Sequence, residues 1–386
     1  MEYREHRGEK LSAIGLGAYA LSGAYGAVDP QGFRAVLRRA FELGVNYYDV
    51  AAAYGEAERI VGEALRPIRD RVLVATKIAP PGDGLRLDAA GISRACEASL
   101  KALGTDYIDI YQVHYDDPLT PVDETVDALE KLVSQGKIRH YGVSHLPPDR
   151  VEEYLSKGHV FSCLMEMNAA ARSGRDRLLP LARRYGAGAI AFSVTARGLL
   201  TGRFAAGARF PKGDIRQWEP QFQRERFQSG LRIADKLAAL GCLYGKSPAQ
   251  VAIAWVLAQS GVICALCGPS TPVHLEENLS GSGWQLEPEH LSDLEHFLAT
   301  EEQHLRAEDA SALREILEYP VGLDARQAFV DLVYAFEVAL EMGLVDEPIM
   351  IPLFRELLEW RKRLAAPGAT AKLEDIRRRA AGVIRY

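Results

Sequence analysis

The chain of 386 residues is 48% hydrophobic and 25% charged, which is ordinary for a folded globular protein and excludes a disordered or collagen-like one. Its 46 Lys and Arg against 52 Asp and Glu leave a net charge of −6, which argues against nucleic acid as the main partner. The charged amino terminus lacks the apolar core of a signal peptide, and no run approaches the ~18 apolar residues that span a bilayer. Together with an odd number of cysteines, five, these features predict a cytoplasmic protein with no membrane partner.

Short apolar runs alternate with amphipathic stretches along the first 300 residues. In residues 32–43 and 120–135 apolar side chains recur every three or four positions, which predicts helices. The runs that are apolar on both faces predict buried parallel strands over residues 12–17, 45–51, 71–79, 108–115, 138–145, 162–168, 187–194 and 262–269. Eight strands alternating with helices predict an α/β protein built as a closed (β/α)8 TIM barrel.

A doubly wound sheet is the competing fold. It normally opens with a G-x-G-x-x-G turn between its first strand and first helix. Here Gly15-Leu-Gly17 continues into Ala18-Tyr-Ala20, so the third glycine is missing. The number of strands and this missing glycine favour the barrel.

Two segments depart from the even repeat. Residues 195–229 form a long connection after the seventh strand, and loops at the carboxyl ends of barrel strands build active sites. Beyond about residue 300 the pattern is helical only, with helices expected over residues 301–317, 324–343 and 349–364 and a basic end at 372–386. We therefore expect a barrel over residues 1–300 and an all-α C-terminal extension over residues 301–386, whose apolar stripe is buried within the chain or across a dimer.

Four ionisable residues lie at or just after the ends of successive predicted strands: Asp49, Tyr54, Lys77 and His114. Lys77 beside Tyr54 would lower the pKa of the phenol, Asp49 would keep Lys77 charged, and His114 would orient a substrate oxygen. Together they could protonate an alkoxide as hydride reaches the adjacent carbon. The alternative is that Asp49 and Lys77 form a structural ion pair and that His114 is a core histidine. The presence of four such residues at successive strand ends favours the catalytic interpretation over this alternative.

With these four residues in the same order, the sequence resembles the aldo-keto reductase family. Further matches are Gly15-Leu-Gly17, Asn46-Tyr-Tyr-Asp49, the segments 136–144, 198–202 and 248–255, and Gly268-Pro-Ser-Thr with Leu275-Glu-Glu-Asn278. The resemblance implies a barrel that binds NAD(P)H and reduces an aldehyde, ketone or sugar carbonyl to the alcohol, or the reverse. It makes Tyr54 the proton donor, assisted by Lys77, Asp49 and His114.

The same resemblance implies which residues hold the cofactor. Around the nicotinamide it assigns Asp49, Ser144, Phe192 and either His145 or Asn168, and it adds Gly17 and Ala18 to the cofactor-binding residues. Near the pyrophosphate it assigns Ser193, Thr195 and the Arg197-Gly198 turn, and at the adenosine half Gly268, Ser270, His274, Glu277 and Asn278. Backbone N–H groups at a helix start suit a phosphate, although Ser270-Thr-Pro272 is equally a good helix cap.

Several positions depart from the family pattern. His145 replaces an Asn, Leu164 a Gln and Met167 a frequent Tyr, so that Asn168 or His145 would have to compensate in holding the carboxamide. Gly268 and His274 stand where members that prefer NADPH often carry Lys or Arg. Arg203 or Arg209 from the long connection could supply that charge, and the family as a whole slightly favours NADP(H) over NAD(H).

The remaining candidates are aromatic residues and cysteines. Tyr19, Tyr25, Tyr115 and Trp218 could line a pocket for a small-molecule carbonyl or alcohol substrate. Cys264 and Cys267 alternate along one strand and point to opposite faces, so we expect core packing and no metal site.

Two further functions remain open. One is a cofactor-binding regulatory or assembly subunit with low turnover, whose helical tail binds a partner or forms a homo-oligomer. The other uses Lys77 as a Schiff-base nucleophile in an aldolase-type barrel.

Overall fold

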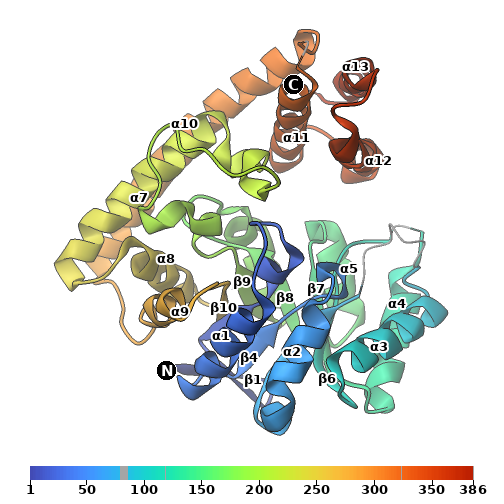
Figure 1. Cartoon of the computed structure of the whole chain (residues 1–386), viewed down its shortest axis with the longest axis vertical. Helices are drawn as coiled ribbons and strands as arrows, with labels where there is room; N and C mark the ends of the chain where they lie inside the picture. The colour runs from blue at the N-terminus through green and yellow to red at the C-terminus, as the bar shows by residue number, and fades with distance from the viewer. Residues whose placement is uncertain (79–85, 118, 323, 386) are drawn as a thin grey trace. The chain divides into compact units, whose positions relative to one another are not determined.

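The protein is described by a computed structural model covering residues 1–78, 86–117, 119–322 and 324–385. Eight parallel strands close into a barrel in the order β10-β3-β4-β5-β6-β7-β8-β9 (Figure 1). They are β3 (Ile14–Gly17), β4 (Tyr47–Asp49), β5 (Leu73–Lys77), β6 (Ile108–Val113), β7 (Ile138–Ser144), β8 (Ser162–Glu166), β9 (Gly188–Phe192) and β10 (Val262–Cys267). The predicted (β/α)8 barrel is confirmed, and every strand lies within its predicted run. The predicted end of the third run, Ala79, lies outside the described residues.

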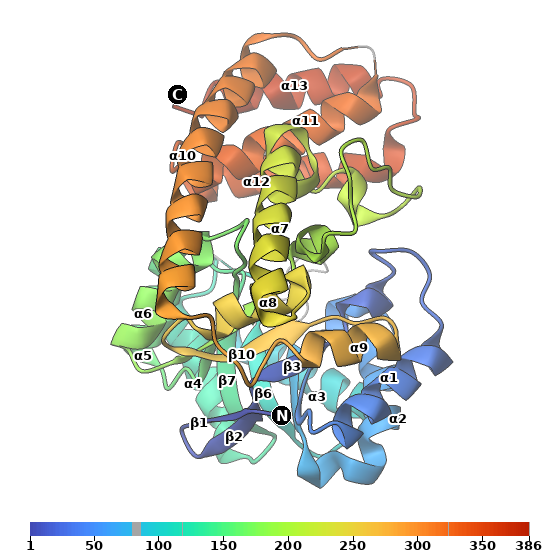
Figure 2. The ribbon, with the colours of Figure 1, turned by 90° about the vertical axis from the view of Figure 1, so that its left-hand side faces the viewer.

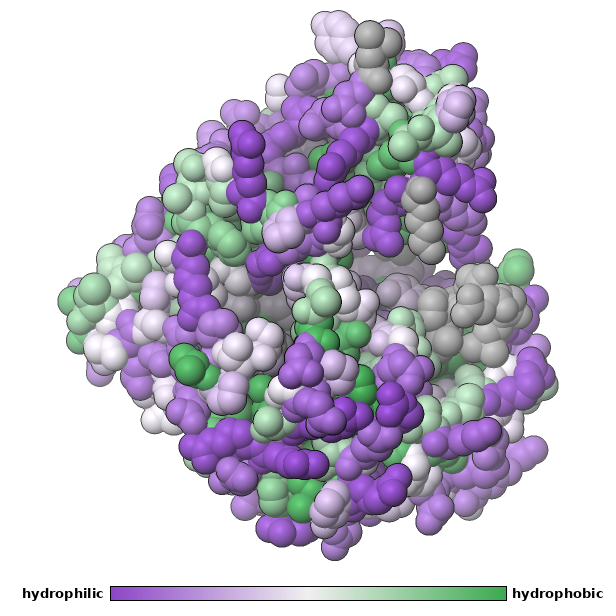
Figure 3. Space-filling model, in the orientation of Figure 1, coloured by the Kyte–Doolittle hydropathy of each residue, from purple (hydrophilic) through white to green (hydrophobic). Residues whose placement is uncertain are grey.

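Helices surround the strands, as Figure 1 shows. They are α1 (Pro30–Glu42), α2 (Ala57–Leu65), α3 (Ala89–Leu103), α4 (Val122–Ser134), α5 (Pro148–Lys157), α6 (Leu179–Arg184), α8 (Pro248–Leu257) and α9 (Pro272–Leu279). In α1 the Asp29 carboxylate caps the first turn, and the apolar side chains at three- and four-residue spacing are buried. Hydrophilic residues cover most of the outer face seen in Figure 3.

The chain divides into two compact units. The barrel unit is Met1–Arg203 with Ala234–Leu291, and the helical unit is Phe204–Ile233 with Ser292–Tyr386. The boundary falls within two long helices, α7 (Arg224–Tyr244) and α10 (Pro288–Glu318). The helix expected at residues 301–317 is therefore the second half of α10. None of the described helices is both long and apolar enough to cross a membrane.

The helical unit has an apolar core of its own. It contains α11 (Ala325–Glu341), α12 (Glu347–Trp360) and α13 (Ala369–Ala381), the last of which overlaps the predicted basic end at residues 372–386. The apolar stripe predicted for residues 324–343 is buried in one cluster with side chains of α10, α12 and α13. Trp218 packs against this cluster, with its ring centroid 6.4 Å from that of Phe329. The stripe is thus covered within the chain.

A buried polar network joins residues 204–233 to the helices of this unit. Arg226 is hydrogen-bonded through Nη2 to Asp309 Oδ2 at 2.6 Å and to Glu341 Oε2 at 2.7 Å. The Tyr334 hydroxyl donates to the other oxygen of Asp309. Because a buried guanidinium needs an acidic partner, these contacts hold the start of α7 against α10 and α11.

A hairpin of β1 (Tyr3–His6) and β2 (Glu9–Ser12) covers the amino-terminal end of the barrel (Figure 2). Arg4 donates from Nη1 to the Val262 carbonyl at 2.5 Å and from Nη2 to the Leu257 carbonyl at 2.8 Å. Arg7 donates to the Val160 carbonyl at 2.8 Å. The hairpin therefore satisfies backbone acceptors at and just before the starts of the strands.

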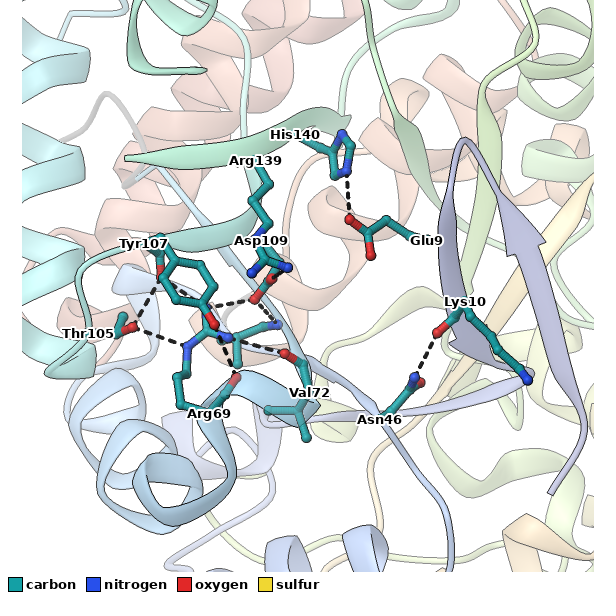
Figure 4. A network of polar contacts seen from close by, with 11 residues as sticks. Glu9, Lys10, Asn46, Arg69, Val72, Thr105, Tyr107, Asp109, Arg139 and His140 are labelled. Atoms are coloured by element: carbon teal, nitrogen blue, oxygen red, sulfur yellow. Dashed lines mark hydrogen bonds and ion pairs between the residues drawn. The ribbon is translucent and has the colours of Figure 1, made fainter. Parts of the chain in front are cut away.

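Asp109, near the start of β6, is the centre of a polar network at this end (Figure 4). Its carboxylate lies 2.6 Å from Arg69 Nη2 and 3.1 Å from Arg139 Nη1, and accepts the Val74 N–H at 2.9 Å. The Tyr107 ring contacts both guanidinium groups, at 4.1 and 4.5 Å from its centroid. Because they pair a buried carboxylate with two arginines at the amino ends of the strands, these contacts indicate a stabilising role.

We expect Asp109→Asn to destabilise the fold by about 2–4 kcal/mol, because it removes the charge that compensates two arginines at a buried site. Urea unfolding followed by circular dichroism measures this. Glu63→Gln, which loosens only the surface pairs of Glu63 with Arg34 and Arg59, should leave the unfolding midpoint close to wild type. Equal midpoints for wild type and Asp109→Asn would contradict the assignment.

Candidate active site

The four residues singled out in the sequence meet at the carboxyl ends of neighbouring strands. Asp49 and Lys77 are the last residues of β4 and β5, His114 follows β6, and Tyr54 lies in the turn after β4. Lys77 Nζ donates to Asp49 Oδ1 and, at 2.8 Å, to the Val50 carbonyl. It also lies 5.4 Å from the centroid of the Tyr54 ring. The centroids of the Tyr54 and His114 rings are 5.9 Å apart.

The local backbone explains how Tyr54 reaches this place. Parallel pairing of β4 and β5 sets Asp49 opposite Ala75, and the Val50 N–H continues the ladder to the Ala75 carbonyl at 2.9 Å. The chain then forms a short 3-10 turn, Ala52–Tyr54, which ends at Gly55 with φ of +64°. A glycine suits this conformation, which lets the chain turn from the tyrosine into α2.

The ionisation states favour a neutral phenol beside a charged pair. Burial raises the pKa of Tyr54 well above its usual range, and the Asp49 charge adds to this. The expectation of a lowered Tyr54 pKa is wrong for the protein alone, because burial and the Asp49 charge dominate over the neighbouring ammonium. Burial, with the Lys77 charge, lowers the pKa of His114. At neutral pH, Tyr54 therefore carries its proton and the His114 imidazole is uncharged.

Aromatic rings extend on both sides of Tyr54 and His114. The ring centroid of Tyr19 lies 5.1 Å from that of Tyr54 and 5.8 Å from that of Tyr25. On the other side, Tyr115 lies 4.3 Å from His114. Three of the four predicted pocket residues thus join the site. The fourth, Trp218, belongs to the helical unit and packs there against Phe329.

The ring series continues to the ends of β7 and β9. His145 contacts Tyr115, with centroids 5.5 Å apart, and Phe192, with centroids 5.0 Å apart. The side chain of Ser144 is buried beside it, and that of Phe192 is partly exposed. These are the residues that the sequence placed near a nicotinamide ring.

Strained backbone gathers at the same ends of the strands. Among the described non-glycine residues, positive φ angles occur at His145, Ser193, Ala196 and Arg197, as well as at Arg7 and Arg224. Arg197 Nη1 pairs with Glu166 Oε1 at 2.6 Å, and Asn168 Nδ2 donates to the Ser193 carbonyl at 3.0 Å. Such strain persists where the surroundings fix it and is typical of binding sites.

Three residues discussed for the carboxamide position are buried in the structure. The amide of Asn168 donates to the Ser193 carbonyl and accepts the Ala170 N–H at 2.9 Å, so Asn168 links its own turn to the segment after β9. Leu164 belongs to an apolar cluster of the barrel, and Met167 is fully buried. Both Cys264 and Cys267 are buried free thiols of β10, in agreement with core packing.

Buried polar atoms at this site lack a partner within the described part of the chain. They are Asp49 Oδ2, His114 Nδ1 and Ser144 Oγ. A buried polar atom without a hydrogen bond is costly, and such atoms at strand ends of a barrel mark a place for a ligand with polar groups.

A second group of predicted residues lies around the start of α9. Gly268 and Ser270 are exposed between β10 and α9, and Thr271 Oγ1 caps the helix by accepting the His274 N–H at 3.2 Å. Arg203 Nη1 lies 2.6 Å from His274 Nε2, and Nη2 donates to Glu277 Oε2 at 2.8 Å. The structure thus brings Arg203 to this end, whereas Arg209 belongs to the helical unit.

The other predicted residues lie along the strand ends between these groups. Gly17 ends β3, and the Ala18 N–H donates to the Asp49 carbonyl at 2.8 Å. Thr195 and Gly198 belong to the strained turn after β9, where the Gly198 N–H donates to the Thr195 carbonyl at 3.0 Å. Asn278 lies in α9.

One buried residue next to the site was missed by the sequence analysis. Glu58 of α2 is only 5% exposed and accepts a hydrogen bond from the Thr76 hydroxyl at 2.6 Å, one residue before Lys77. The signal was present, because this acidic residue interrupts the buried side of α2 formed by Ala57, Ile60 and Val61.

Comparison with known proteins identifies the family. A sequence model of the aldo/keto reductase family matches residues 13–299. Aldo-keto reductase YhdN of Bacillus subtilis is 34% identical over 310 residues, covering 77% of this chain and 94% of its own. The solved structure of the glycerol dehydrogenase AKR11B4 from Gluconobacter oxydans is similar with a TM-score of 0.69 and 30% identity, covering 78% of this chain and 95% of its own.

The holo form of aldo-keto reductase AKR11C1 from Bacillus halodurans is similar with a TM-score of 0.66 and 26% identity, covering 77% of this chain and 96% of its own. In each comparison the matched part amounts to about three quarters of this chain, and nearly all of the relative is covered. The closed barrel, the four converging residues and these matches lead to one conclusion: the chain belongs to the aldo/keto reductase family.

Proposed function

We propose that this protein reduces an aldehyde, ketone or sugar carbonyl to the alcohol, or catalyses the reverse reaction, with Tyr54 as the proton donor. Membership of the family supports NAD(P)H-dependent carbonyl oxidoreduction in general. The observation that carries the specific proposal is the Tyr54 phenol, neutral and placed between the Lys77 ammonium and the His114 ring.

The site suits a nicotinamide dinucleotide, which supplies or accepts the hydride when bound. The unpartnered Ser144 Oγ and Asp49 Oδ2 offer polar contacts at one end, and Phe192 offers a ring for stacking. The strained turn at residues 193–198 and the start of α9 offer backbone N–H groups for phosphates. Gly268, Ser270, Glu277 and Asn278 would meet the adenosine half.

The side chains have separate parts in the reaction. In reduction, Tyr54 gives its hydroxyl proton to the substrate oxygen as negative charge develops there. Lys77 stabilises the resulting phenolate, and Asp49 holds Lys77 in place through the buried ion pair. The uncharged His114 ring can donate one N–H to the same substrate oxygen. In oxidation of an alcohol each proton moves in the opposite direction.

Tyr54→Phe should lower kcat by about 10²–10⁴-fold, because the ring remains but the general acid is lost. Steady-state assays with NADPH or NADH and a panel of aldehydes, ketones and sugars measure this. Cofactor binding, followed by fluorescence titration, should change little. Tyr185→Phe, which removes a hydroxyl bonded to Glu152 on the outer helices, is the matched control and should keep wild-type turnover. Unchanged kcat in Tyr54→Phe would disprove the proton-donor role.

We further propose that NADP(H) is favoured over NAD(H) through Arg203 and His274. The support is that Arg203 lies beside His274 and Glu277 at the start of α9, where the family resemblance puts the adenosine half, although Glu277 already pairs with its charge. The preference is therefore modest, since binding the phosphate has to compete with an existing ion pair.

Arg203→Gln should weaken NADPH binding about tenfold, equivalent to about 1.4 kcal/mol, and change NADH binding less than twofold. Dissociation constants for both nucleotides measure the ratio. Arg209→Gln serves as a control from the same connection, because Arg209 is exposed in the helical unit. If Arg209→Gln rather than Arg203→Gln loses NADPH affinity, the phosphate contact belongs to Arg209. If Arg203→Gln weakens NADPH and NADH binding equally, the proposed role of Arg203 is refuted.

A second candidate function is a regulatory or assembly subunit with low turnover. The observation in its favour is the helical unit, whose core is complete and which exposes Tyr319, Met342 and Ile349. Full occupancy by cofactor together with negligible turnover on the whole substrate panel would favour this function. Light scattering of the full chain tests whether these helices form a homo-oligomer.

A further inference from the structure

The buried carboxylate of Glu58 is not explained by the four residues at the reacting end of the barrel. It belongs to the second residue of α2 and is 5% exposed, while its partner Thr76 in β5 is fully buried. Thr76 Oγ1 donates to Glu58 Oε1 at 2.6 Å. Burial raises the pKa of Glu58, and Thr76 and the buried Ser99 of α3 act against this increase. A buried carboxylate that accepts a hydrogen bond from a fully buried hydroxyl of the neighbouring strand is a specific contact.

The position of Glu58 relates this residue to Lys77. Successive side chains of a strand point to opposite faces, so Thr76 faces the helices while Lys77 faces Asp49 at the reacting end. Glu58 therefore contacts β5 on its helix-facing side, one residue before Lys77. Its charge also acts through the strand, since Glu58 raises the pKa of Lys77 against the lowering effect of burial.

The same residue is tied to Tyr54 through the chain. Tyr54 ends the short turn, Gly55 reverses the backbone, and α2 begins at Ala57, so Glu58 lies four residues after the tyrosine. A contact between Glu58 and Thr76 thus fixes the tyrosine-bearing segment against the lysine-bearing strand. Small displacements of reacting groups have large effects on rate.

We propose that Glu58 is a positioning residue, which through Thr76 holds the turn of Tyr54 in register with Lys77 and keeps a second negative charge on the helix-facing side of β5. The proposal rests on the proposed function for its effect on rate, but the geometry that it describes can be measured without turnover. Glu58 touches neither the reacting end nor a cofactor subsite named above.

The test compares Glu58→Gln, Thr76→Val and Thr76→Ser with Asp109→Asn. Glu58→Gln keeps size and an acceptor oxygen but removes the charge, Thr76→Val removes the donor, and Thr76→Ser restores it. Asp109→Asn is the matched control, because it also neutralises a buried carboxylate bonded to β5, at the opposite end of the barrel. All assays are run well below the lowest melting temperature of the set.

The first readout needs no turnover. With tyrosines labelled by ¹³C at the ζ-carbon, the Tyr54 resonance of the cofactor-free protein is assigned by its loss in Tyr54→Phe. We expect Glu58→Gln and Thr76→Val to move this resonance and Thr76→Ser to leave it near its wild-type position. Asp109→Asn should lower the melting temperature but leave the Tyr54 resonance at its wild-type position. This difference separates positioning from general stability.

The second readout is kinetic. Glu58→Gln should lower kcat about tenfold with KM and cofactor affinity within about twofold, because the reacting groups are misplaced and not lost. Since the Glu58 charge raises the pKa of Lys77, removing it should shift the alkaline limb of the kcat profile to lower pH. Thr76→Ser should restore most of the rate lost in Thr76→Val.

The results separate the two proposals. If wild type reduces no carbonyl with either nucleotide, the proposed function fails, and the Tyr54 resonance alone decides the role of Glu58. If Glu58→Gln leaves the resonance, kcat and the pH profile unchanged, the positioning role is overturned. It is equally overturned if Asp109→Asn moves the resonance as far as Glu58→Gln does.

Discussion

The ion pair between Lys77 and Asp49 is the interaction on which the site depends. Both side chains are almost fully enclosed, at 1% and 6% exposure, and neither charge could be buried there without the other. The pair places an ammonium against the Tyr54 ring, and the second Asp49 oxygen has no hydrogen-bond partner among the described residues. The Val50 carbonyl is a second acceptor for the lysine, so that the end of β4 and the end of β5 are held together.

The two ends of the barrel carry different polar features. At the amino-terminal end, the β1–β2 hairpin and the Asp109 network form ion pairs and hydrogen bonds within the chain. At the carboxyl end lie the Asp49–Lys77 pair, Tyr54 and His114, and the turns after β7 and β9 carry strained backbone. This difference fits the proposed binding of a ligand at the carboxyl end, where parallel barrels build their sites.

Much of the site could be predicted, because strand ends and polar residues are both visible in a sequence. Asp49, Lys77 and His114 follow three apolar runs, and parallel strands bring such ends together. One expectation went wrong because it concerns the surroundings of a side chain. The direction of the Tyr54 pKa depends on burial and on the Asp49 charge, neither of which is visible in the sequence. Glu58 was overlooked because its importance lies in a contact with Thr76, distant in the sequence.

The sequence by itself determined the eight strands, the helices between them and the order of the residues at the reacting end, because each follows from local periodicity. Only the tertiary structure decided that residues 204–233 pack with the C-terminal helices, through Trp218 and the buried Arg226 network. It also showed that α10 continues through residue 301. Such choices depend on which distant apolar and charged side chains satisfy one another, and no local pattern contains that information.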